Sequence, residues 1–83
     1  MQDRFTFGQM RTVLTELGFV EVRRSNGIAL KHAKSNTVLL FRPYEDSDPL
    51  QPAEVFVVAK QLDERGLLER ESLEALLSQT PAG

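Results

Sequence analysis

The sequence predicts an α+β domain in which helices cover one face of a three-stranded antiparallel sheet, with the element order α-β-β-β-α-α. Residues 20–42 read as three short strands joined by two tight turns, and such turns are too short for the crossovers that parallel strands need. The segments on either side repeat apolar residues at helical spacing. The 83 residues are expected to form a single domain, 1–83, with flexible ends at 1–5 and 80–83.

The first helix is predicted to begin after Thr6. Thr6 and Gln9 have the spacing of a capping box, in which the threonine hydroxyl accepts from the N3 amide and the glutamine reaches back. An apolar stripe follows at Phe7, Met10, Val13, Leu14 and Leu17. Gly18 suits the left-handed position that ends a helix.

The three strands are read from alternation and from turn residues. Val20 and Val22 alternate with charged neighbours, and the turn residues 25–27 (Ser-Asn-Gly) separate them from the second strand. A second turn at 34–36 leads into residues 37–42. Because that third segment is almost wholly apolar, we expect it to be central in the sheet or buried on both faces.

The rest of the chain is predicted to be a loop and two helices. Residues 43–51 hold two prolines and three acids, which excludes regular structure. Pro52 suits the first position of a helix, and Gly66 ends that helix. The last helix is expected at 70–79, with Leu73, Leu76 and Leu77 on its apolar side.

The charge is distributed unevenly along the chain. Residues 22–44 contain five basic side chains and no acidic ones, whereas residues 45–83 contain nine acidic and three basic ones. Such asymmetry suggests contact with nucleic acid, although solvated strand exteriors would look the same. The candidate RNA-binding residues are Arg23, Arg24, Lys31, Lys34 and Arg42. Two of these positions have odd numbers and three have even numbers, so we expect the charges to be spread over both faces and the strand ends.

Composition excludes several other classes of function. The chain has no cysteine, and its one histidine has no carboxylate pair at helical spacing, so neither a metal site nor a cofactor is expected. No run of residues is long and apolar enough for a membrane span, and the first residues do not read as a signal peptide. A cytoplasmic location is the expectation.

The order of these segments resembles the HicA-type toxins of bacterial toxin–antitoxin pairs. LTELGFVEVRR, LKHA, TVLLFRP and the leucine-rich segment entered through LQP carry the resemblance, which spans about residues 7–77. It implies a fold like the double-stranded-RNA-binding domain (dsRBD-like), cleavage of mRNA as an interferase, and a small antitoxin protein as partner.

The sequence departs from this family at the residue that matters most for chemistry. The resemblance implies a catalytic histidine after a Gly-Ser pair at the start of the second strand, but that position here falls on Gly27 or Ile28. Neither side chain can transfer a proton. His32 is a weak substitute, because four residues of strand place it about 13 Å away. Tyr44 beside Arg42 is a second candidate, as a ring on which a base could stack.

Three functions remain open at this point. The first is an RNA-binding domain of the HicA-like type without ribonuclease activity. The second is a protein-interaction module that retains an antitoxin-binding surface, and the acidic loop at 45–48 favours it because acids repel RNA. The third is an active mRNA interferase with an atypical site.

Overall fold

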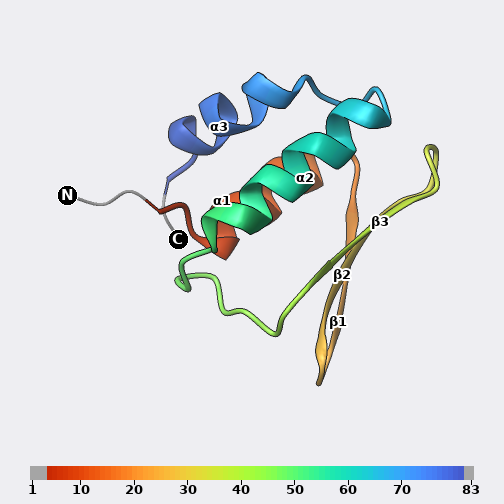
Figure 1. Ribbon diagram of the computed structural model, residues 1–83. Coiled ribbons are helices and arrows are strands. Elements are labelled where there is room, and N and C mark those ends of the chain that lie inside the picture. Colours follow the sequence, from red (N-terminus) through yellow and green to blue (C-terminus); the bar gives the residue numbers. More distant parts are fainter. Residues whose placement is uncertain (1–3, 82–83) are drawn as a thin grey trace.

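The computed structural model describes residues 4–81 and confirms the predicted element order. Figure 1 shows all three helices on the same side of the sheet, and none of the described residues covers its other side. The elements are α1 (Phe7–Glu16), β1 (Val20–Arg24), β2 (Gly27–His32), β3 (Thr37–Phe41), α2 (Pro52–Glu64) and α3 (Arg70–Gln79).

The sheet is an antiparallel meander with β2 in the middle. Ala29 on β2 lies opposite Val22 on β1 and opposite Leu40 on β3, which fixes the register of both pairings. Successive side chains on a strand point to opposite faces. Alternate residues of β2 and β3 are therefore buried against the helices, namely Ile28, Leu30, His32, Thr37, Leu39 and Phe41.

The prediction that the third strand is central in the sheet or buried on both faces was wrong. β3 is an edge strand, and Val38 and Leu40 expose 47% and 78% of their surface. An apolar run is typical of a strand covered on both sides, but here every helix packs on one side. The core therefore accounts for Leu39 and Phe41 but not for the apolar side chains of Val38 and Leu40.

The predicted capping box at the start of α1 is present and extends further than expected. The Thr6 hydroxyl accepts from the Gln9 amide at 3.2 Å, and the Gln9 side-chain oxygen accepts from the Thr6 amide at 2.8 Å. The Gln9 side-chain nitrogen also donates to the carbonyl oxygens of Leu77, at 3.1 Å, and Thr80, at 2.7 Å. One buried side chain thus joins the start of α1 to the end of α3.

The loop between β3 and α2 is irregular, as predicted, and folds back onto α1. The Phe7 amide donates to the Asp48 carbonyl and the Gly8 amide to the Asp46 carbonyl, both at 2.9 Å. The Arg11 guanidinium binds the Asp46 carboxylate at 2.7 Å. The acidic loop therefore supplies the hydrogen bonds that the first turn of α1 lacks.

The segments predicted to be flexible ends are 1–5 and 80–83. Residues 1–3 and 82–83 lie outside the described residues. Of the others, Phe5 accepts a hydrogen bond from the Leu50 amide at 2.8 Å, and Thr80 accepts from Gln9. Both residues are therefore tied to the domain.

Candidate interaction site on the open sheet face

The face of the sheet that points away from the helices is called the open face here. The register assigns to it one set of alternate residues from each strand: Val20, Val22, Arg24, Gly27, Ala29, Lys31, Val38 and Leu40. None of these side chains is acidic. Most of them are apolar, and Val20 and Leu40 are mainly exposed.

A hollow of about 380 Å³ runs along the middle strand on this face, and we call it the trough. Gly27 and Ala29 form its floor because they are the smallest side chains on the open face, while Leu40 and Val38 on β3 stand beside them. Arg24 and Lys31 also line it.

Ala29, Val38 and Leu40 are not among the site residues that the sequence predicts. The one sequence signal for a hollow at this place is that Gly27 and Ala29, two small residues, alternate within a strand whose neighbouring strands carry larger side chains. That signal becomes visible only when the register is known, because the register shows which neighbours stand on the same face.

The glycine in the floor of the trough cannot be replaced without a shift. A Cβ atom at Gly27 would lie 2.8 Å from the carbonyl oxygen of Phe41, which is closer than such atoms approach. The close pairing of β2 with β3 thus requires glycine at the position where the resemblance would place a catalytic side chain.

The structure brings two of the five predicted basic residues together on the open face. Arg24 and Lys31 share this face although one number is even and the other odd, because the β1–β2 pairing matches Arg24 with Gly27 and Val20 with Lys31. Odd and even residue numbers therefore do not show which residues of two different strands share a face. Lys34 lies in the β2–β3 turn and is exposed.

Arg23 lies on the other face of β1 and is already engaged. Its guanidinium forms a salt bridge to the Glu21 carboxylate at 3.2 Å and donates to the Tyr44 carbonyl at 3.1 Å. It therefore helps to hold the loop after β3 and does not add to the charge of the open face.

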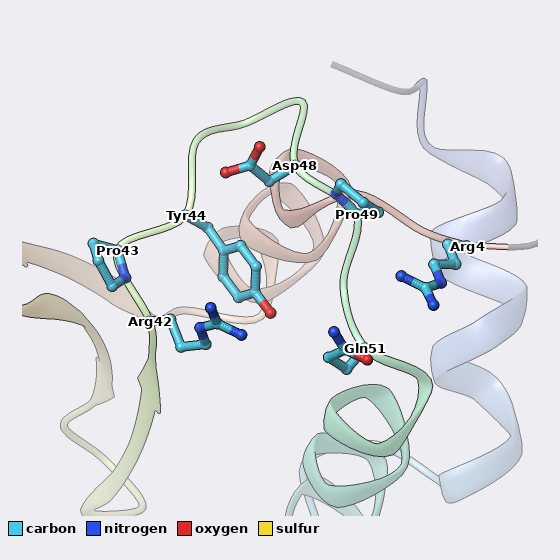
Figure 2. A pocket seen from close by; sticks show the side chains of 7 residues that line it. All are labelled: Arg4, Arg42, Pro43, Tyr44, Asp48, Pro49 and Gln51. Carbon is cyan, nitrogen blue, oxygen red and sulfur yellow. The ribbon is translucent and has the colours of Figure 1, made fainter.

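Arg42 follows the end of β3 and points toward the loop, as Figure 2 shows. Its guanidinium carbon lies 5.8 Å from the centre of the Tyr44 ring. Both residues line a second hollow, of about 300 Å³, which Arg4 borders from the other side. Arg42 is thus separated from Arg24 and Lys31.

Tyr44 is a core residue and is not available for stacking on a base. Its side chain is buried, and its ring lies 5.7 Å from the Phe7 ring in a stacked arrangement. Its hydroxyl donates to the Glu54 carboxylate. Burial and, second, the bond to Glu54 raise the pKa of Tyr44 above its usual value.

His32 is buried on the helix side of the sheet, opposite the trough. Its Nδ1 accepts from the Ser35 amide at 3.2 Å and lies 2.8 Å from the Ser35 hydroxyl. Its ring packs on Phe19 at 5.0 Å, and a Cβ atom on Gly18 would lie 3.2 Å from Nε2. These contacts give His32 a structural role in closing the β2–β3 turn.

The other position implied by the resemblance, Ile28, also faces the helices. Its side chain is only 2% exposed and belongs to the core. Neither Gly27 nor Ile28 therefore presents an ionisable group to a substrate. Within residues 4–81, no three His, Cys, Asp or Glu side chains are placed to hold a metal ion.

The helices of the described part of the chain are too short or too polar to cross a membrane. Comparisons with protein-family models, with curated proteins and with solved structures found no match to this chain.

Proposed function

We propose that this chain is a HicA-like interaction domain that binds a small, antitoxin-like partner protein in the trough and does not cleave RNA. The observation that carries the proposal is the trough itself, a hollow of about 380 Å³ in an apolar, solvent-exposed sheet face. Contiguous exposed apolar surface with polar margins is characteristic of protein-binding sites.

The chemistry of the open face defines the partner. A pocket floored by Gly27 and Ala29 accepts one apolar side chain, which is how anchor residues of interfaces are bound. Arg24 and Lys31 are the only charged side chains of this face. The matching surface is therefore an apolar anchor flanked by carboxylates.

The absence of cleavage follows from the side chains near the trough. RNA cleavage needs a group that takes a proton and another that returns one. Gly27 and Ile28 can do neither, and His32 faces the helices. Growth arrest on induced expression that disappears in His32→Ala would contradict this part of the proposal.

Filling the trough tests the proposed function. The chain is co-expressed with the product of the neighbouring reading frame, and the affinity of the purified pair is measured by calorimetry. Ala29→Phe occupies the anchor pocket and should weaken binding by at least about 30-fold, the loss typical of an interface hot spot. Val20→Phe is the matched control, because Val20 is on the same face but does not line the trough.

Two results would refute this assignment. One is that Ala29→Phe binds the partner as tightly as the unmodified chain. The other is that Val20→Phe weakens binding equally, since the trough would then have no special part. Circular dichroism of both variants verifies that the fold is retained.

RNA binding is the second candidate function. It is supported by Arg24, Lys31 and Lys34, which are exposed and form no salt bridge with any residue from 4 to 81. If these three residues neutralise phosphates, affinity for a hairpin RNA should fall about 20- to 40-fold between about 50 and 200 mM salt.

A triple alanine variant at these positions tests the RNA-binding candidate. It should remove most of the salt dependence in a fluorescence anisotropy titration, whereas Lys60→Ala, an exposed cation on α2, should not. Absence of salt-sensitive binding by the unmodified chain would exclude this function.

A further inference from the structure

The two edge strands of the sheet differ in charge. The edge strand β1 reads VEVRR and carries three charged side chains, whereas the edge strand β3 reads TVLLF and carries none. Proteins protect an edge from pairing with another chain by placing charges or proline on it. β1 has this protection and β3 does not.

The backbone of β3 offers hydrogen-bonding groups on its free side. The carbonyl oxygen of Phe41 points at β2, since it lies 2.8 Å from where a Cβ on Gly27 would be. In an antiparallel pair, alternate residues bond to the partner strand, so Val38 and Leu40 direct their N–H and C=O groups away from β2. No other part of residues 4–81 bonds to these groups.

The exposed apolar surface continues from this edge onto α2. A groove of about 190 Å³ separates β3 from α2, and Leu40, Ala53 and Val57 are among the residues that line it. Val57 is 50% exposed although it is a large apolar side chain. The strand edge and the adjacent helix face thus form one surface, which we call the β3 edge surface.

We propose that two copies of the chain pair β3 with β3 about a two-fold axis and form a continuous six-stranded antiparallel sheet. Centring the axis on Leu39 places Val38 opposite Leu40 of the second copy, and Thr37 opposite Phe41. Val38 and Leu40 are the residues with outward backbone groups, so both such pairs exchange N–H···O bonds.

The strand is complementary to itself. Every cross-axis pair within it joins uncharged residues, so no like charges oppose each other. Val57 lines the same groove as Leu40, so pairing at β3 would bring the exposed Val57 of each copy close to the second copy. β3 has no charged side chain that could select a strand from another protein by charge complementarity. Pairing with a second copy of β3 does not require such a charge.

One strand edge and one helix face make a small interface. Interfaces that bury less than about 1,200 Å² are typical of weak association, so we expect a dimer in the micromolar range. Sedimentation equilibrium of the purified chain alone, from about 1 μM to 1 mM, should show the mass rising from 9.4 kDa to twice that value.

A matched pair of lysine substitutions locates the interface. Leu40→Lys places a charge on β3 and should raise the dimer dissociation constant at least tenfold. Val20→Lys introduces the same charge at an exposed valine on the same face but at the β1 edge, and should leave the constant unchanged. Val57→Lys should act like Leu40→Lys.

The proposal is overturned if the unmodified chain stays monomeric up to 1 mM, or if Val20→Lys weakens the dimer as much as Leu40→Lys. Because the assay uses this chain alone, its outcome is independent of partner binding in the trough.

Discussion

Replacing Gln9 by alanine should destabilise the domain far more than a helix-surface substitution does. Gln9 is 8% exposed, and its side chain makes four hydrogen bonds, of which the one from the Thr6 hydroxyl is long, at 3.4 Å. In Gln9→Ala the Thr6 amide loses its acceptor, and the Thr80 carbonyl loses its side-chain donor. The Leu77 carbonyl retains one bond, from the Thr80 amide at 3.1 Å.

The magnitude follows from these losses. A buried polar group left without a partner costs about 1–3 kcal/mol, and carbonyls that keep one bond cost less. We expect a loss of about 2–3 kcal/mol in the free energy of unfolding. In a domain of this size that lowers the Tm by roughly 10–20 °C. Gln79→Ala, an exposed glutamine in the last turn of α3, is the control and should change little.

Urea unfolding followed by circular dichroism measures this difference. Gln9→Glu provides a second test, because a carboxylate can accept from Thr6 but cannot donate to the two carbonyls. At neutral pH this variant should be no more stable than Gln9→Ala. As pH falls toward about 4 the protonated carboxyl supplies one donor, and the gap to the unmodified chain should narrow. A loss below about 0.5 kcal/mol in Gln9→Ala would refute the reasoning.

Two further substitutions test the sheet and the loop. Gly27→Ala should lower the free energy of unfolding, measured in urea, by about 1–3 kcal/mol, because its methyl group meets the Phe41 carbonyl. Gly66→Asn is the control and should change the stability little, because the site has open space and asparagine tolerates its left-handed φ. Burial and Glu54 raise the pKa of Tyr44, so the folded state favours the neutral phenol. The stability that this preference contributes should be fully present below pH 10 and should be lost as the pH rises through the folded-state pKa. In Tyr44→Phe the alkaline loss should shrink, and an unchanged pH profile from 8 upward would contradict this assignment.

The elements were predictable from the sequence because their signals are local. The capping pair of Thr6 and Gln9, the Gly18 stop and Pro52 at the start of α2 each act within one helical turn, and the structure places each as expected. Tight turns required an antiparallel meander, and that is the observed topology. Local chemistry was sufficient for these features.

The candidate site was less predictable because it depends on register and on which side the helices pack. Arg24 and Lys31 meet on one face only through the β1–β2 pairing. Arg42 would lie on that face if β3 continued, but the strand ends at Phe41 and the side chain turns toward Tyr44. No spacing in the sequence indicates that Gln9 reaches the end of α3, since the partners are 68 and 71 residues away.

The loop after β3 also bears on the order in which the chain folds. The first amides of α1 bond to the carbonyls of Asp46 and Asp48, which lie about forty residues further along the chain. The strands between them pair with immediate neighbours, and such local contacts require the closing of short loops only. We therefore expect the first turn of α1 to gain these bonds after the meander has formed and brought the loop back to it. The backbone carbonyls of Asp46 and Asp48 thus join the loop that follows the sheet to the helix that precedes it.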